Sequence, residues 1–324
     1  MHDKKPTMFV TRRWPKAAED ALSTHFDVTF NDADAPLDKA ALCAGFASHD
    51  IAAPTVSDVI DADVIAAAAG GSCRLIANYG VGVNHIDLAA AANHGIPVSN
   101  TPGVLTDATA DLTLTLMLML ARRAGEGERE LRAGEWAGWR PTHLVGRAIT
   151  GKRLGIIGMG RIGKAVAQRA QFGFGMDVCF YNRSRIDDLG ALKAEQMDSV
   201  MAVCAASDFI SLHCAASPET RHILDEKALA AMHDGAYVIN TARGDVINET
   251  HLVAALKTGG IGGAGLDVFQ GEPAINPAIL DAPNTVLLPH LGSATEETRN
   301  AMGLKVVQNA CAFVAGEPLP DPVS

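Results

Sequence analysis

The chain has 324 residues, of which 48% are hydrophobic and 20% charged, a balance typical of a folded protein rather than a disordered one. At this length we expect two domains, each large enough to bury a core. The net charge of −10 argues against a surface built for nucleic acid or an anionic membrane. The six cysteines include no C-x-x-C pair, Met1–Val10 has no apolar signal segment, and Leu112–Ala121 is too short to span a bilayer. We therefore predict a reduced, soluble, cytoplasmic protein.

The first hundred or so residues alternate between strand and helix patterns. Strands are expected at Met8–Thr11, Phe26–Phe30, Arg74–Asn78 and Ile96–Ser99, and helices at Pro15–Thr24, Asp38–Ala44, Ala62–Ala69 and Asp87–His94. We expect Ile51-Ala52 to begin a loop, because Pro54 follows closely. The alternation predicts an α/β unit, in which the glycine-containing segment Tyr79–Val83 follows a strand where such sheets bind ligands.

A long helix is predicted at Thr106–Arg123, and its nearly continuous apolar residues predict burial between two bodies, so we place the domain junction there. The alternation resumes at Gly151, with strands expected at Arg153–Ile157, Met176–Tyr181, Asp208–His213, Ala236–Asn240, Gly263–Asp267 and Thr285–Leu288. This order predicts a doubly wound parallel sheet. The final helix, Ala294–Val314, is long enough to return to the first unit, and the tail Pro318–Ser324 should be irregular.

One turn between a strand and a helix has the spacing of a dinucleotide-binding site, Gly158-Met159-Gly160-Arg161-Ile162-Gly163. Gly158 would permit the tight turn, Gly160 would let backbone approach a pyrophosphate, and Gly163 would allow close packing of helix on strand. The N-terminus of the following helix would offer N–H groups to the phosphates. The alternative is a glycine-rich turn without a ligand, but the strand before it and the helix after it favour a dinucleotide.

The end of the next strand indicates which dinucleotide binds. An NAD site usually carries an acidic residue about 20 residues after the glycines, on the ribose 2′-hydroxyl. Here that position is Asn182, followed by Arg183-Ser184-Arg185. Two guanidiniums can pair with a 2′-phosphate that a carboxylate would repel. We therefore predict NADPH as the cofactor, with NADH disfavoured; the alternative is an exposed basic turn.

Side chains suited to acid–base chemistry follow the last three predicted strands: Arg243, Glu272 and His290. The carboxyl ends of parallel strands meet at one edge of a sheet, so a guanidinium, a carboxylate and an imidazole could act together on an oxyanion substrate. The residues alone leave the choice open, because His213 also ends a strand and Arg221 is a second candidate cation. Glu272 could equally cap a turn. No His or Cys pair has the spacing of metal ligands, so no metal site is predicted.

In these segments the chain resembles the D-isomer-specific 2-hydroxyacid dehydrogenases over nearly its whole length. The matching segments are Asn78–Asp87, Gly158–Gly163, Asn240–Gly244, Leu266–Pro273 and Pro289–Thr295. The resemblance implies two Rossmann-like domains with doubly wound parallel sheets and an active site in the cleft between them. Residues 1–103 plus 292–324 would form the substrate (catalytic) domain, and residues 104–291 the dinucleotide-binding domain. It also implies a homodimer.

The resemblance also implies roles for individual residues. Arg243 would bind the substrate carboxylate and carbonyl, His290 would be the general acid–base, and Glu272 would be its hydrogen-bonded partner, which favours His290 over His213. The backbone around Val81-Gly82 would also bind the substrate carboxylate. Thr109 would contact the cofactor from the linking helix, and Asp267 the nicotinamide carboxamide. The residues expected at the cofactor are Thr109, Gly158, Gly160, Arg161, Ile162, Gly163, Asn182, Arg183, Ser184, Arg185, Cys214, Thr241, Asp267 and Gly292.

Within the family, Asn182–Arg185 looks like the NADP-preferring glyoxylate/hydroxypyruvate reductases. Trp139-Arg140-Pro141 resembles a segment of those enzymes in which a Trp reaches the partner subunit's active site, and packing in a dimer interface alone is the other role open to Trp139. One departure is Cys214-Ala215-Ala216, where the family often has a proline-containing turn, so the loop shape near the nicotinamide is open.

The predicted function is NADPH-dependent reduction of glyoxylate or hydroxypyruvate to glycolate or D-glycerate. The alternatives are a D-lactate-like or bulkier 2-oxo-acid dehydrogenase, a formate- or phosphite-oxidising relative, and a non-catalytic, nucleotide-sensing dimer like a corepressor. A phosphoglycerate substrate is disfavoured, because Ala52-Ala53-Pro54 in the expected pocket loop provides no cation for a substrate phosphate.

Overall fold

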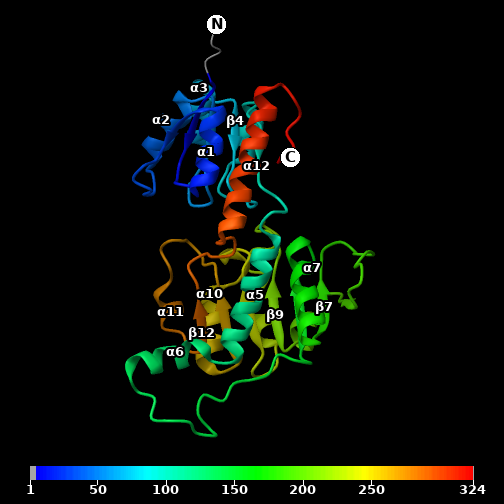
Figure 1. Ribbon diagram of the computed structural model, residues 1–324. Coiled ribbons are helices and arrows are strands. Elements are labelled where there is room, and N and C mark those ends of the chain that lie inside the picture. Colours follow the sequence, from blue (N-terminus) through cyan, green and yellow to red (C-terminus); the bar gives the residue numbers. More distant parts are fainter. Residues whose placement is uncertain (1–4, 324) are drawn as a thin grey trace. The chain divides into compact units, whose positions relative to one another are not determined.

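The computed structural model describes residues 5–323, and the chain divides into two compact units (Figure 1). One unit runs to Leu105 and resumes at Ser293, and the other covers Thr106–Gly292. Residues 1–4, which belong to the segment predicted to lack a signal peptide, lie outside the described residues. Residue 324, the last of the predicted irregular tail, also lies outside them. Among the helices described, none is long and apolar enough to cross a membrane.

Across residues 5–323 the strands form two parallel sheets, and the sheet of the first unit has the order β2-β1-β3-β4-β5. Its strands are β1 (Thr7–Val10), β2 (Asp27–Phe30), β3 (Ile51–Ala53), β4 (Leu75–Ala77) and β5 (Val98–Ser99). The order reverses between β1 and β3, and in such sheets ligands bind outside the carboxyl ends of the strands near that point. The helices of this unit are α1 (Lys16–His25), α2 (Lys39–Ser48), α3 (Ala62–Gly70), α4 (Leu88–Asn93) and α12 (Glu296–Val314).

Helices cover both faces of the first sheet because successive side chains of each strand point to opposite faces. In β1, Met8 and Val10 belong to a core cluster with residues of α1 and α12, whereas Phe9 belongs to a second cluster with α2 and α3. The predicted return of the final helix is confirmed: a side chain at Gly303 of α12 would collide with Ala18 of α1. Glycine there lets the two helices pack closely.

The expectation that Ile51-Ala52 begins a loop is wrong. Ile51–Ala53 is β3, which lies between β1 and β4 and is fully buried. Pro54 ends the strand without preventing it, because a proline removes only its own N–H donor. Residues that precede it still pair with strands on both sides, so three residues suffice.

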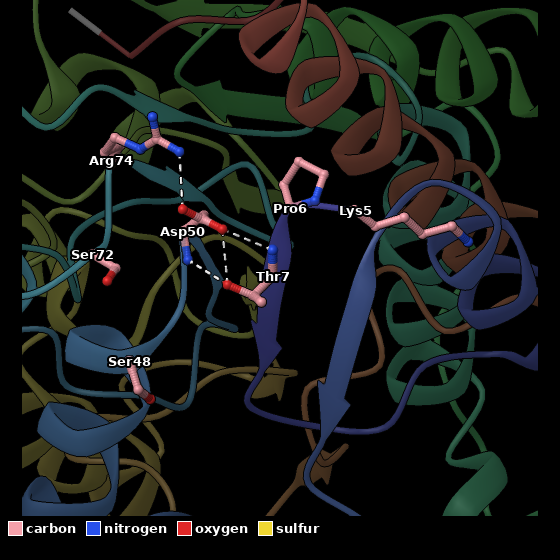
Figure 2. A pocket seen from close by; sticks show the side chains of 7 residues that line it. All are labelled: Lys5, Pro6, Thr7, Ser48, Asp50, Ser72 and Arg74. Atoms are coloured by element: carbon pink, nitrogen blue, oxygen red, sulfur yellow. Dashed lines mark hydrogen bonds and ion pairs between the residues drawn. The ribbon is translucent and has the colours of Figure 1, made fainter. Parts of the chain in front are cut away.

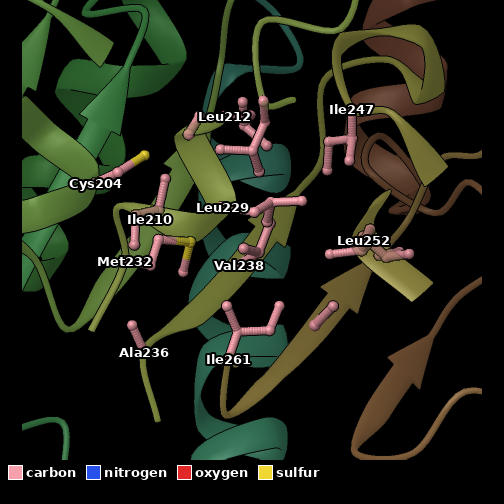
Figure 3. Packing of buried hydrophobic residues seen from close by; sticks show 14 of the residues in the cluster. Cys204, Ile210, Leu212, Leu229, Met232, Ala236, Val238, Ile247, Leu252 and Ile261 are labelled. Atoms are coloured by element: carbon pink, nitrogen blue, oxygen red, sulfur yellow. The ribbon is translucent and has the colours of Figure 1, made fainter. Parts of the chain in front are cut away.

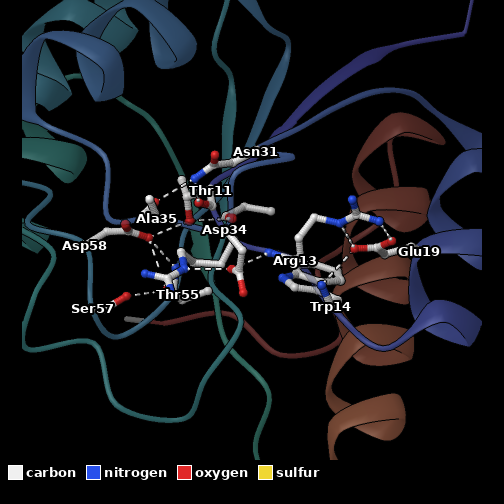
Figure 4. A network of polar contacts seen from close by, with 12 residues as sticks. Thr11, Arg13, Trp14, Glu19, Asn31, Asp34, Ala35, Thr55, Ser57 and Asp58 are labelled. Atoms are coloured by element: carbon white, nitrogen blue, oxygen red, sulfur yellow. Dashed lines mark hydrogen bonds and ion pairs between the residues drawn. The ribbon is translucent and has the colours of Figure 1, made fainter.

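Polar side chains hold the loops at the carboxyl edge of the first sheet (Figure 4). The buried carboxylate of Asp58 accepts hydrogen bonds from Thr11 Oγ1 at 2.5 Å and from the backbone N–H of Thr55 at 2.7 Å. Glu19 accepts two hydrogen bonds from Arg13, at 2.7 and 2.6 Å. These side-chain hydrogen bonds hold the loops after β1 and β3 in place.

The second unit has a seven-stranded parallel sheet, counted over the described residues, with the order β12-β11-β10-β9-β6-β7-β8. Its strands are β6 (Arg153–Ile157), β7 (Asp177–Tyr181), β8 (Ala194–Gln196), β9 (Phe209–Leu212), β10 (Tyr237–Asn240), β11 (Gly263–Leu266) and β12 (Thr285–Leu287). The helices are α5 (Thr106–Ala121), α6 (Ala124–Ala133), α7 (Arg161–Gln168), α8 (Val200–Ala206), α9 (Glu226–Ala230), α10 (Glu249–Thr258) and α11 (Pro277–Leu280). The order reverses between β6 and β9, as in doubly wound dinucleotide-binding folds.

One core of this unit lies between the sheet and α8 to α10 (Figure 3), where Leu212 of β9 and Val238 of β10 belong to the same cluster as Leu229 and Leu252. On the other face, α5 packs against α7, β10 and β11. Most apolar residues of α5, such as Leu116 and Met117, are buried, whereas Leu112, Leu118 and Met119 are only half-buried. The expected burial of this helix between two bodies stays a prediction.

Strand β8 is absent from the predicted strands. It has three residues, Ala194-Glu195-Gln196, lies at the edge of the sheet and pairs only with β7. None of the three side chains is fully buried, so the segment has no apolar run that would mark a strand.

Candidate functional site

The candidate residues of the second unit follow the carboxyl ends of its strands. Gly158 comes after β6, His213 after β9, Arg243 after β10, Asp267 after β11 and His290 after β12. Because all these strands are parallel, the five positions lie along one edge of the sheet, where doubly wound folds bind ligands.

The three glycines of the turn after β6 differ in what a side chain there would meet. Gly158 has φ +98°, and a Cβ there would lie 2.7 Å from the backbone nitrogen of Cys214. A Cβ on Gly163 would collide with the carbonyl oxygen of Gly158, so the helix packs tightly on the turn. Gly160, the N-cap of α7, has nothing within 4 Å of its Cβ position. An open backbone position at a helix N-terminus fits the pyrophosphate of a dinucleotide.

The loop after β7 presents two exposed guanidiniums, those of Arg183 and Arg185. Arg185 pairs with Asp187 at 2.9 Å, but the side chains are 87% and 83% exposed, so this ion pair contributes little stability. The Asn182 amide donates hydrogen bonds to the carbonyl and hydroxyl oxygens of Ser184, at 3.0 and 3.1 Å. The loop therefore offers two cations at its surface, which fits a ligand phosphate.

The imidazole and carboxylate of the proposed acid–base pair are in direct contact. Nδ1 of His290 lies 2.8 Å from Oε2 of Glu272, and Oε1 of Glu272 accepts the backbone N–H of Phe269 at 2.7 Å. Burial raises the pKa of Glu272, but the hydrogen bond and charge of His290 outweigh it, so the pKa lies below its usual range. Both oxygens of Glu272 thus have partners, and one of them fixes the orientation of the imidazole ring.

Asp267 supports the backbone next to His290. Its two carboxylate oxygens accept the N–H groups of Leu291 and Gly292, at 2.6 and 2.8 Å, and its carbonyl oxygen accepts the N–H of His290 at 2.9 Å. Burial raises the pKa of this carboxyl group. Thr109 Oγ1 donates to the carbonyl of Gly292 at 2.9 Å. The structure therefore brings three of the expected cofactor residues into one hydrogen-bonded cluster.

Arg243 lies on a turn that is stabilised by hydrogen bonds of the neighbouring residue Asn240. The Asn240 side chain accepts the N–H of Ala242 at 3.0 Å and donates to the Arg243 carbonyl at 2.8 Å. A side chain at Gly244 would collide with the backbone of Phe269, so the turn lies against the loop that ends in Glu272. Burial lowers the pKa of the Arg243 guanidinium, while the charge of Glu272 acts in the opposite direction.

The alternative candidates have different surroundings. Nε2 of His213 is hydrogen-bonded to Ser211 Oγ at 2.8 Å, and burial lowers the pKa of His213 to about 3. This imidazole is therefore neutral at physiological pH. Arg221 is exposed, and burial raises the pKa of the Cys214 thiol to about 11. Trp139 is 81% exposed.

The substrate loop expected in the first unit follows β4. Asn78 donates to the carbonyl of Gly82 at 3.1 Å, and Asn100 donates to the carbonyl of Val81 at 2.9 Å. Among the hydrogen bonds of residues 5–323, none has the N–H of Val81 or Gly82 as its donor. Side-chain amides thus hold the carbonyl groups of this loop, which leaves N–H groups suited to a carboxylate.

A polar pocket lies at the opposite, amino-terminal edge of the first sheet (Figure 2). Asp50 accepts hydrogen bonds from Thr7 and from Arg74 there, each at 2.9 Å. These groups satisfy one another, so we assign the pocket no ligand. Within residues 5–323 no cluster of His, Cys, Asp or Glu side chains is arranged to hold a metal ion.

Sequence reasoning did not single out Asn100 or Gln196, although both hold loops at the carboxyl edges of the sheets. Asn100 acts on a residue 19 positions away, and Gln196 contacts the loop 182–186 from β8. Neither residue lies in a recognisable motif, so only the folded contacts reveal them.

These observations define a class of protein: an α/β protein of two units, of which the second has the strand order and glycine turn of a dinucleotide-binding domain. Residues 114–292 match the model of the NAD binding domain of D-isomer specific 2-hydroxyacid dehydrogenases. The chain belongs to the D-isomer specific 2-hydroxyacid dehydrogenase family and, within it, to the glyoxylate reductase branch. It is an oxidoreductase that uses a nicotinamide cofactor, and the predicted family and two-domain α/β fold are confirmed.

Individual relatives agree with this placement. The glyoxylate reductase of Thermococcus litoralis is 41% identical over 99% of this chain and 97% of its own length. The glycerate dehydrogenase of Hyphomicrobium methylovorum is 44% identical over 71% of each chain. Among solved structures, the NADPH-dependent glyoxylate/hydroxypyruvate reductase of Sinorhizobium meliloti, in complex with NADP and malonate, is 31% identical. It matches with a TM-score of 0.85 over 99% of this chain and 97% of that one.

Proposed function

We propose that this protein reduces glyoxylate or hydroxypyruvate to glycolate or D-glycerate with NADPH. The observation that carries the proposal is the contact of His290 with Glu272, at the same sheet edge as Arg243. The names of the relatives support the substrate class, since they include glyoxylate reductases and a glycerate dehydrogenase. The reaction consumes one 2-oxo acid, one NADPH and one proton, and yields one 2-hydroxy acid and NADP⁺.

The protein residues would position the substrate and move its proton. When bound, the reduced nicotinamide supplies a hydride to the carbonyl carbon C2. His290 donates a proton from Nε2 to the carbonyl oxygen, because Nδ1 is hydrogen-bonded to Glu272. Arg243 holds the carboxylate and stabilises the negative charge that develops on the oxygen. As the family resemblance implies, the N–H groups of Val81-Gly82 would also bind the carboxylate.

The same proposal assigns the cofactor residues. The backbone of Gly158–Gly163 would hold the pyrophosphate, with Arg161 and Ile162 at the start of α7. Support comes from the open position at Gly160, which offers backbone without an obstructing side chain. Asn182–Arg185 would hold the 2′-phosphate, and the exposed guanidiniums of that loop support NADPH over NADH. Cys214 and Thr241, which follow β9 and β10, would border the cofactor on the same sheet edge.

We further propose a cytoplasmic homodimer in which residues 1–103 with 292–324 bind substrate and residues 104–291 bind the cofactor. The support for a dimer is a set of exposed apolar side chains in and after α6. Leu131, Trp136, Trp139 and Val145 are 63%, 52%, 81% and 65% exposed. In the dimer Trp139 would be covered, either by packing alone or beside the partner subunit's substrate.

The function is tested by following NADPH or NADH oxidation with glyoxylate, hydroxypyruvate, pyruvate and phenylpyruvate. The proposal expects the highest kcat/KM with NADPH and one of the first two acids. A preference for pyruvate would make the protein a D-lactate-like dehydrogenase, and a preference for phenylpyruvate a bulky 2-oxo-acid reductase. NADPH binding without turnover of any of these four acids would contradict the proposed reaction and favour a nucleotide-sensing dimer.

A further inference from the structure

We propose that Gln196, at the end of β8, is a positioning residue for the 2′-phosphate of NADPH, and this rests on the proposed choice of NADPH. Its side-chain amide bonds three positions of the loop 182–186. Oε1 accepts the backbone N–H of Ile186 at 3.0 Å. Nε2 donates to the carbonyl oxygens of Ser184 and Asn182, at 3.1 and 3.4 Å.

The register of the sheet explains why this side chain reaches the loop. Gln196 pairs with Phe180 in the parallel ladder of β7 and β8, and the N–H of Met197 donates to the Phe180 carbonyl at 2.7 Å. Strand β7 ends one residue later, at Tyr181, and the loop begins. Gln196 therefore lies beside the point where the chain leaves the sheet. Its side-chain amide forms hydrogen bonds with loop residues that no longer pair with a strand.

These hydrogen bonds hold the loop 182–186 in one shape and so fix where its backbone presents Arg183 and Arg185. Arg183 and Arg185 project into solvent, and neither is fixed by burial. An unsupported loop would have to be ordered when it binds a phosphate, which costs conformational entropy and weakens affinity. The hydrogen bonds of Gln196 keep the loop ordered before the phosphate binds. It acts through the loop backbone and needs no contact with the ligand.

The amide group is also chemically suited to this place. A glutamate of the same shape could still accept the Ile186 N–H, but it could not donate to the two carbonyl groups. It would also add a negative charge close to the two arginines and weaken the attraction of a phosphate. A methionine would keep the volume and remove all three hydrogen bonds.

The chain provides a matched control in Gln171, which supports the other end of β8. Its Oε1 accepts the N–H of Lys193 at 2.8 Å, and its Nε2 donates to the Lys193 carbonyl at 2.6 Å. Gln171 therefore makes the same kind of bonds, but to a residue before β8. The variant Gln171→Met removes a comparable support without changing the loop 182–186.

The test compares Gln196→Met, Gln196→Glu and Gln171→Met in the full-length protein. Gln196→Met should raise the KM for NADPH about five- to tenfold, with kcat and the KM for NADH changed less than about twofold. Gln196→Glu should raise the NADPH KM further. Calorimetric titration with 2′-AMP and 5′-AMP gives a readout without turnover: Gln196→Met should weaken 2′-AMP and spare 5′-AMP. Gln171→Met should leave both affinities unchanged.

The possible failures can be told apart. A wild-type protein that binds 2′-AMP no better than 5′-AMP would overturn the choice of NADPH itself. A wild-type preference for 2′-AMP that survives in Gln196→Met would overturn the role of Gln196 alone. Equal losses for 2′-AMP and 5′-AMP, or equal losses in Gln171→Met, would show general destabilisation and also refute the positioning role.

Discussion

The Nδ1 atom of His290 lies 2.8 Å from Oε2 of Glu272, although 18 residues separate them in the chain. His290 has φ +55°, a left-handed conformation that is unusual outside glycine and costs on the order of 1 kcal/mol. Its N–H donates to the carbonyl of Asp267, which holds the backbone in this conformation. The direction of the imidazole is thus set twice, by the backbone and by Glu272, and we expect function to depend on both.

Replacing His290 by Ala removes the proposed proton donor. We expect kcat/KM for glyoxylate or hydroxypyruvate to fall by about 10²- to 10⁴-fold, the usual contribution of general acid–base catalysis. Binding of NADPH, followed by calorimetry, should be unchanged because the glycine turn is intact. His213→Ala is the comparison, and a larger loss there than in His290→Ala would contradict the assignment.

Replacing Arg243 by Lys retains one positive charge but loses the planar guanidinium that can bind a carboxylate through two hydrogen bonds. We expect kcat/KM to fall by roughly 10²-fold, and the substrate KM to rise. Arg221→Lys should behave as the wild type. Steady-state kinetics at several substrate concentrations measures both parameters, and unchanged kinetics of Arg243→Lys would remove Arg243 from the substrate site.

Glu272→Gln tests the pairing with His290 through stability. The pKa of Glu272 is lower in the folded protein than its ordinary value of about 4.3. A depressed carboxyl pKa adds stability that is fully present above the unfolded value and is lost as the pH falls through the folded value. The wild type should therefore be more stable than Glu272→Gln at neutral pH, and the difference should shrink below about pH 4.3.

Urea unfolding of the two proteins at a series of pH values measures that difference. Both side chains of the pair are about one-third exposed, at 33% and 32%, so solvent screening should keep the effect small. A stability difference that stays constant, or grows as the pH falls, would be inconsistent with an ionised Glu272 paired with His290.

Two glycine variants separate folding from cofactor binding. A Cβ at Gly160 meets nothing within 4 Å, whereas a Cβ at Gly163 collides with the Gly158 carbonyl. Gly160→Ala should keep the melting temperature and weaken NADPH binding, because the added methyl group lies where the pyrophosphate approaches. Gly163→Ala should weaken NADPH binding and also lower the melting temperature. Normal NADPH affinity in Gly160→Ala would place the dinucleotide elsewhere.

The double variant Arg183→Gln with Arg185→Gln tests the nucleotide preference. Loss of two charge-assisted contacts should raise the KM for NADPH by about 10- to 100-fold and leave the KM for NADH nearly unchanged. The exposed residue Arg122, which directly follows α5, provides the control, as Arg122→Gln changes surface charge away from the loop. Equal effects on both nucleotides would argue against a 2′-phosphate site.

Most elements of the fold follow from local sequence patterns. Buried parallel strands such as β6 and β10 are short apolar runs, and the helices between them have their own periodicity and end signals. The two strands that the sequence patterns missed have one cause. Both β3, with three residues before Pro54, and β8, with no buried side chain, are strands because of the neighbours they pair with. Pairing with a distant strand leaves no local signal.

The residues of the candidate site also fall into two groups: those that a local sequence pattern identifies and those that it leaves among several candidates. Gly158–Gly163, Arg183 and Arg185 stand out in the sequence because a phosphate site needs backbone freedom and cations at fixed spacing. Arg243, Glu272 and His290 were candidates among several, since histidines and arginines also follow other strands. The choice between His290 and His213 needed either the family resemblance or the fold.

By itself the sequence determined the alternation of strands and helices, the glycine turn and the basic loop, because each depends on residues close together in the chain. It also determined the family, because each of the matching segments is a short local pattern. Only the tertiary structure decided that His290 contacts Glu272, that Asp267 holds the backbone beside it, and that Gln196 supports the loop 182–186. These contacts join residues 10 to 25 positions apart. They exist because parallel strands bring their carboxyl ends to one edge, which no local pattern specifies.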